Sequence, residues 1–195
     1  MPIIFSFIVF EEMGMESENK REKLKEFALE FLKKIKLYGR PVFLCVGSDK
    51  YVCDSLAPMV AERLKKTYNV NAYVYGGLDY NIDGTNLMEA VNYIETEHPN
   101  SFLVLIDATL GDDVGEVKIT EGSFAGLGRT LPIRKIGTLS ILGVVARKGK
   151  DFSLNSTRLK VVVELAEFIS TGCAMALDFL DASFVPNSRI CCNTH

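Results

Sequence analysis

Two aspartates are the residues of this sequence whose type and position could do chemistry. Asp54 closes the loop of residues 47–54, which follows a short apolar run, and Asp107 directly follows another such run. Two carboxyls that lie close together rarely ionise together, because repulsion raises the pKa of one and leaves a shared proton. One can then serve as an acid and the other as a base, which suffices to activate water against an amide carbonyl.

Both aspartates also have a purely structural interpretation. Asp54 stands where a helix is expected to begin, so its carboxylate could accept backbone N–H bonds as an N-cap. Asp107 could cap a following turn. Residue type and spacing leave these alternatives open, and the two roles can coexist at Asp54.

Few side chains could complete a different kind of catalytic site. The chain has two histidines: His98, which is expected at the opposite, amino-terminal edge of the sheet, and His195, which is the last residue. We therefore expect no metal, no cofactor, and no Ser-His-Asp or Cys-His arrangement. Cys53 is only a minor candidate nucleophile, because the neighbouring carboxylate of Asp54 raises the pKa of its thiol.

The elements that must position the aspartates alternate along the chain. Short apolar runs predict strands, and helical periods predict helices. The strands are expected at residues 41–46, 71–76, 101–106, 116–120 and 137–146. The helices are expected to begin at residues 24, 54 and 86, and the last one to span residues 154–179. This alternation predicts an α/β fold in three layers, α/β/α, around a mostly parallel sheet. With the common strand order 2-1-3, Asp54 and Asp107 should face each other across the crevice beyond strands one and three.

Four further residues are expected to support the pair. Asp49 and Ser55 lie in or beside the Asp54 loop, and Gly126 and Gly128 lie in a glycine-rich stretch that follows Asp107. The glycines, with Arg129, could offer backbone N–H groups and a cation to a developing oxyanion, although a surface turn is the commoner role of such a stretch.

Length and composition limit the class of protein. The 195 residues, 48% of them hydrophobic, suit one folded domain, expected over residues 20–180 between an N-terminal extension (1–19) and a C-terminal tail (181–195). A net charge of -3 offers no basic excess for nucleic acid. The apolar start is too short for a membrane span, and the five scattered cysteines suggest no disulfide framework, so we expect a cytoplasmic protein without a membrane partner. A homo-oligomer is left open.

Four segments, in this order, carry a family resemblance: GSDKYVCDSLAP (47–58), LIDATLG (105–111), TLPIRKIGTLSILGVV (130–145) and LNSTRL (154–159). Over roughly residues 20–175 the chain resembles the sporulation protein family typified by YyaC. That family is similar to the germination protease of spore-forming bacteria and, more distantly, to the hydrogenase maturation endopeptidases. The chain departs from the family pattern at Cys53 and Ala57, where the relatives usually have glycine.

The resemblance implies a phosphorylase/hydrolase-like fold and a metal-independent peptidase site carried by Asp54 and Asp107. It also implies a protein or peptide substrate and a role in sporulation or germination. A rival interpretation is a catalytically silent relative that binds a peptide or partner protein in the same crevice. A hydrolase needs both aspartates for turnover, whereas a binder could keep its affinity when either becomes asparagine. A third hypothesis is a metal-dependent maturation endopeptidase, which would need a third metal ligand beside the two aspartates.

Overall fold

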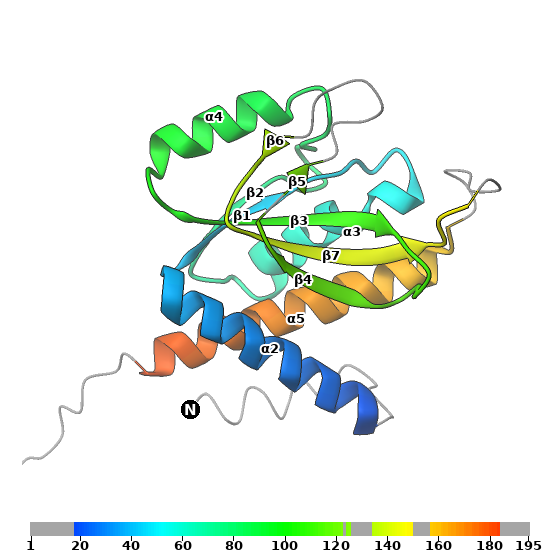
Figure 1. Ribbon diagram of the computed structural model, residues 1–195, viewed down its shortest axis with the longest axis horizontal. Coiled ribbons are helices and arrows are strands. Elements are labelled where there is room, and N and C mark those ends of the chain that lie inside the picture. The colour runs from blue at the N-terminus through cyan, green and yellow to red at the C-terminus, as the bar shows by residue number, and fades with distance from the viewer. Residues whose placement is uncertain (1–17, 123, 126–133, 150–156, 184–195) are drawn as a thin grey trace, which may run out of the picture.

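The computed structural model of the chain describes residues 18–122, 124–125, 134–149 and 157–183 (Figure 1). Within these residues the elements are, in chain order, α2 (Glu18–Tyr38), β1 (Pro41–Cys45), the 3-10 turn η1 (Val52–Asp54), α3 (Leu56–Glu62), the π-helical turn η2 (Arg63–Thr67), β2 (Tyr73–Tyr75), α4 (Leu87–Glu97), β3 (Phe102–Leu110), β4 (Val117–Glu121), β5 (Phe124–Ala125), β6 (Arg134–Lys135), β7 (Leu139–Ala146) and α5 (Leu159–Ser183).

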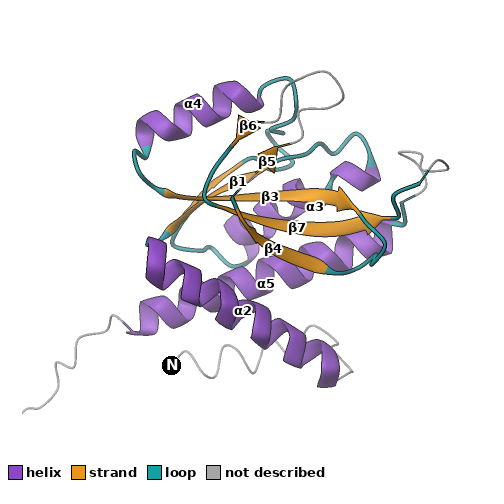
Figure 2. Ribbon diagram, viewed as in Figure 1, coloured by secondary structure: helices purple, strands orange, loops and turns teal. Residues whose placement is uncertain are grey.

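The main sheet of the described residues has five strands in the order β2-β1-β3-β7-β4 (Figure 2). Neighbouring strands are parallel except for β4, which runs antiparallel to β7 at one edge. β5 and β6 form a separate antiparallel pair. The strand order 2-1-3 and the mostly parallel sheet that the alternating pattern predicts are therefore confirmed.

Helices cover both faces of this sheet, so the three-layer α/β/α prediction is also confirmed (Figure 1). Side chains of β1 alternate between two cores, as the two-residue period of a strand requires. Phe43 and Cys45 join the larger core with α2, α3 and α5, while Val42 and Leu44 join the smaller core with α4. Among the described helices, none combines the length and the apolar character that a membrane span requires.

Helix α2 packs on α5 and is joined by two ion pairs to the outer strand β4 and to the residue just before it. Lys23 pairs with Glu116 at 3.0 Å, and Lys34 pairs with Glu121. The two lysines are separated by a helical length of about 16 Å, and the two glutamates by a similar length of extended chain. The matching spacings align α2 with the exposed edge of the sheet.

Several boundaries differ from those expected. β2 is shorter than residues 71–76, and β7 begins at Leu139 because Gly137, with φ of 76°, turns the chain just before it. The last helix begins at Leu159 and continues to Ser183, so residues 181–183, expected in a tail, are helical. The remaining tail, the N-terminal extension to residue 17, and residues 154–156 of the expected last helix lie outside the described residues.

Candidate active site

The loop after β1 is folded back on itself by two consecutive backbone amides. The N–H of Gly47 donates to the carbonyl of Ile82 (2.8 Å), and the N–H of Ser48 donates to the main-chain carbonyl of Asp54 (3.0 Å). Gly47 has φ of 151°, and a Cβ there would lie 2.2 Å from the carbonyl oxygen of Asp54. Only glycine fits this position, and it fixes where the loop meets η1.

Asp54 is the last residue of η1, one step outside the position that an N-cap would occupy. α3 begins at Leu56 with Ser55 as its N-cap, and no side chain caps it. The interpretation of Asp54 as the N-cap of this helix is therefore wrong. A separate 3-10 turn intervenes, because the hydroxyl of Ser55 donates back to the carbonyl of Val52 (2.9 Å) and its N–H binds the same carbonyl (3.3 Å).

Close packing brings η1 to the centre of the sheet. A Cβ at Gly143 of β7 would lie 2.3 Å from Cδ2 of Leu56, so the missing side chain lets the first residue of α3 rest on the sheet. Gly143 is paired with Ala108, the neighbour of Asp107 in β3. η1 itself contacts β3 and α5. These contacts set Asp54 near the strand that carries Asp107.

Asp107 lies inside β3, opposite Leu142 of β7, and not directly after the strand as expected. The strand continues to Leu110 because β7 pairs with it as far as Ala146. The carboxylate of Asp107 accepts the N–H of Ala108 at 2.7 Å. A residue within a strand cannot cap a turn, so that alternative for Asp107 is wrong as well.

The carboxyls of Asp107 and Asp54 interact electrostatically. Burial, opposed by the Ala108 N–H and aided by the negative charge of Asp54, raises the pKa of Asp107 from 3.8 to about 7. Burial also raises the pKa of Asp54, the N–H of Ser48 lowers it, and the charge of Asp83 raises it. The negative charge of Asp54 thus acts on Asp107, and Asp107 keeps a substantial protonated fraction around neutral pH.

Neither Cys53 nor Cys45 has the properties of an activated thiol. Cys53 is buried, and its pKa is raised first by burial and then by the charge of Asp54. Its φ is not positive, so the change from the glycine of the family pattern does not strain η1. Cys45 belongs to the core, where burial raises its pKa to about 12. A raised pKa disfavours the thiolate that a nucleophile needs.

The expected supporting residues divide into three cases. The exposed Asp49 accepts a hydrogen bond from Nδ2 of Asn81 at 2.6 Å, which joins the loop after β1 to the loop before α4. Ser55 is buried and holds η1 together. Gly126 and Gly128, with Arg129, lie outside the described residues.

Asp83 is a further acidic residue of this region, which the sequence interpretation missed. The N–H and hydroxyl of Thr85 donate to its carboxylate at 2.9 and 2.6 Å and, with the charge of Lys50, lower its pKa. The spacing Asp-x-Thr just before a helix indicates such a turn. That signal could have drawn attention to residue 83, although it gives no hint that Asp54 lies nearby.

Within the described residues no group of three or more His, Cys, Asp or Glu is arranged to hold a metal ion. His98 caps the end of α4 and accepts or donates a 2.7 Å hydrogen bond with the hydroxyl of Tyr75. It lines a cavity of about 590 Å³ together with Pro41 and Ser101, where β1 and β3 begin. His98 is therefore at the amino-terminal edge of the sheet, away from Asp107.

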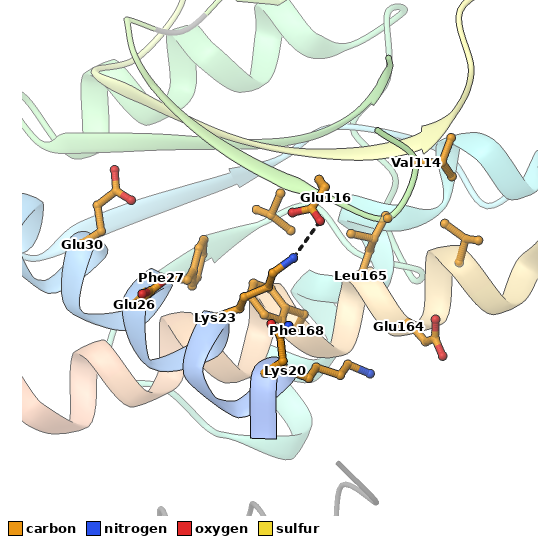
Figure 3. A pocket seen from close by; sticks show the side chains of 14 residues that line it. Lys20, Lys23, Glu26, Phe27, Glu30, Val114, Glu116, Glu164, Leu165 and Phe168 are labelled. Carbon is orange, nitrogen blue, oxygen red and sulfur yellow. Dashed lines mark hydrogen bonds and ion pairs between the residues drawn. The ribbon is translucent and has the colours of Figure 1, made fainter. Parts of the chain in front are cut away.

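A second hollow, of about 760 Å³, lies between α2, α5 and the β4 edge (Figure 3). Its lining combines the apolar side chains of Phe27, Leu165 and Phe168 with charged groups that include the Lys23–Glu116 ion pair. Neither aspartate of the pair lines it. The hollow is separate from the candidate active site.

Comparisons with known proteins match most of the chain. The profile of a family described as a protein of unknown function (DUF1256) matches residues 12–172. The uncharacterized protein YyaC of Bacillus subtilis (strain 168) is 34% identical over 148 residues, which cover 72% of this chain and 71% of that protein. The crystal structure of a NiFe hydrogenase maturation protease HycI from Thermococcus kodakarensis KOD1 has 17% identity and a TM-score of 0.49, covering 75% of this chain and 97% of that chain. The first two matches confirm the YyaC resemblance of the sequence segments.

Proposed function

This chain belongs to the DUF1256 family, and we propose that it is a peptidase-like hydrolase that cleaves a peptide bond with Asp54 and Asp107. The observation that carries the proposal is the electrostatic interaction between two partly buried carboxyls supplied by separate elements. A buried carboxyl group with a strongly shifted pKa costs stability and often marks a functional site.

We assign the roles within the pair from the larger pKa shift, which is that of Asp107. Asp107, whose pKa is raised to about 7, holds the proton, and Asp54 is the ionised base. Asp54 takes a proton from water, and the water oxygen bonds to the amide carbon. At the same time Asp107 gives its proton to the carbonyl oxygen. The resulting diol collapses when Asp54 passes its proton to the amide nitrogen, the C–N bond breaks, and the diol returns a proton to Asp107.

The proposed setting is the cytoplasm of a spore-forming cell, with a protein or peptide as substrate. Support comes from the resemblance of the segments at residues 47–58 and 105–111 to the sporulation family and its germination protease relatives. In this proposal the pair works without a metal, because the acid and base are both carboxyls and His98 is distant from them.

The test compares hydrolysis by wild type, Asp54→Asn and Asp107→Asn. Small proteins from an extract of a spore-forming bacterium are incubated with each protein, and cleaved fragments are detected by mass spectrometry. Each substitution should abolish cleavage, because either one removes a member of the acid–base pair. Asp112→Asn, at an exposed position, is the matched control and should cleave as wild type does.

Cleavage should also depend on pH in a defined direction. It should fall as the pH rises through about 7, because Asp107 then loses the proton that it must donate. Cleavage that continues undiminished in both folded asparagine variants contradicts the aspartate pair. A wild type that never cleaves but binds a peptide or partner protein, with either variant binding equally well, would instead establish the silent relative.

A further inference from the structure

The residues 81–86 form a hydrogen-bonded turn just before α4. The side chain of Asn86 accepts the N–H of Asp83 (2.9 Å) through its Oδ1 and donates to the carbonyl of Asn81 (3.0 Å) through its Nδ2. Thr85 binds the carboxylate of Asp83 with both its N–H and its hydroxyl. The backbone and side chain of Asp83 are thus both held in place.

This turn is attached to the loop that carries Asp54. The neighbouring amides of Gly47 and Ser48 bind the carbonyls of Ile82 and Asp54 respectively, so two consecutive residues of this loop hold both segments. Asp83 directly follows Ile82. A second link joins the same loops, from Nδ2 of Asn81 to the carboxylate of Asp49. These bonds attach the segment that carries Asp83 to the loop that carries Asp54.

We propose that Asp83 is a positioning residue of the site: the 81–86 turn fixes its carboxylate next to the loop that carries Asp54, and its negative charge makes Asp54 a stronger base toward water. The role as a base rests on the function proposed above, whereas the influence of one carboxylate on the other does not depend on turnover.

The titratable groups around Asp54 come from several elements. β3 contributes Asp107, the loop before α4 contributes Asp83, and η1 contributes the thiol of Cys53. The loop after β1 contributes Lys50 and Asp49. The charge of Lys50 lowers the pKa of Asp83, and the carboxylate of Asp49 accepts a hydrogen bond from Asn81. The negative charge of Asp83 raises the pKa of Asp54, and the anchoring by Thr85 keeps Asp83 ionised.

The test follows the carboxyl carbon signals of aspartates by ¹³C NMR during a pH titration. In Asp83→Asn the midpoint of Asp54 should move to lower pH, because the repelling charge is gone while the shape of the turn is kept. Asp83→Glu, which retains the charge, should restore at least part of the shift. Asp79→Asn is the matched control: Asp79 lies in the same loop and pairs with Lys66, and its loss should leave the midpoint unchanged.

Where hydrolysis is measured, the acidic limb of the pH profile should move in the same direction as the Asp54 midpoint. Thermal unfolding confirms that each variant is folded. An Asp54 midpoint that does not move in folded Asp83→Asn, or moves equally in Asp79→Asn, overturns the role of Asp83 while leaving the aspartate pair intact. A wild type without turnover refutes the proposed function, yet the titration still decides whether Asp83 acts on Asp54.

Discussion

At the scale of single residues, a carboxyl group within a central strand carries an energetic cost. Asp107 lies between β1 and β7 in the sheet, and burial is the main reason that its pKa is raised to about 7. The folded chain therefore binds this proton more tightly than the unfolded chain does between pH 3.8 and about 7. Across that range, stability falls as the pH rises.

Replacing Asp107 with asparagine should for this reason stabilise the fold at pH 8. The gain in the free energy of unfolding should be at most about 4 kcal/mol, and most of it should be lost by pH 4, close to the pH below which the wild-type carboxyl is protonated in both states. Urea denaturation of the two proteins at both pH values measures it. Asp112→Asn should give no such difference, and equal stability of Asp107→Asn and wild type at pH 8 would show that Asp107 is well solvated.

The sequence indicates Asp54 and Asp107 because each follows an apolar run, and a parallel sheet collects such positions at one edge. It does not reveal Asp83, since this residue reaches the site through a loop whose path depends on the Gly47–Ile82 hydrogen bond. Nor does it reveal that Asp107 is internal to its strand. That outcome depends on how far β7, some thirty residues later, continues to pair.

At the scale of elements, the site depends on the turn between β1 and η1. Gly47→Ala should destabilise the protein by about 1–3 kcal/mol or more, because alanine tolerates this φ poorly and its Cβ would overlap the Asp54 carbonyl. It should also reduce hydrolysis by displacing Asp54. Thermal unfolding and the cleavage assay measure the two effects separately.

Gly39 provides the matched control for this substitution. It too has a positive φ, of 96°, but a Cβ there would meet nothing within 4 Å. Gly39→Ala should therefore carry the backbone cost alone, about 1 kcal/mol, and leave hydrolysis unchanged. If both alanine variants behave alike, the contact between Gly47 and Asp54 does not hold the loop.

The strands and helices themselves follow from the sequence more directly than their ends do. α4 begins after Asn86 and buries Leu87, Val91 and Ile94, as its periodicity predicts. The predicted start of α3 at Asp54 is wrong, because Asp54 resembles an N-cap by type while Ser55 and Val52 close a separate 3-10 turn. Such a short turn has no periodicity from which it could be recognised.

At the scale of the whole molecule, the larger core joins elements from both ends of the described chain. Phe31 of α2 lies against the rings of Phe43 in β1 and Phe102 in β3, and α5 supplies Ile169 and Cys173 to the same core. Because one core unites α2, the sheet and α5, we propose that residues 20–180 form a single cooperative domain.

Unfolding in urea should then follow one transition, whether it is monitored by far-UV circular dichroism or by the fluorescence of the tyrosines. Phe31→Ala should lower the free energy of unfolding by about 3–5 kcal/mol and shift both signals together, since its ring is fully buried. Two separate transitions, or a shift in only one signal, would contradict a single domain.

The position of α5 at the end of the described chain has a consequence for protein synthesis. Both aspartates have been synthesised by residue 107, but η1, which carries Asp54, contacts a helix that begins only at Leu159. A nascent chain that stops before this helix lacks the α5 part of the cover over the sheet face around Phe43 and Val104, and exposed apolar surface attracts chaperones and proteases. The surroundings of Asp54 are therefore complete only after α5 has left the ribosome, later than the synthesis of either carboxyl.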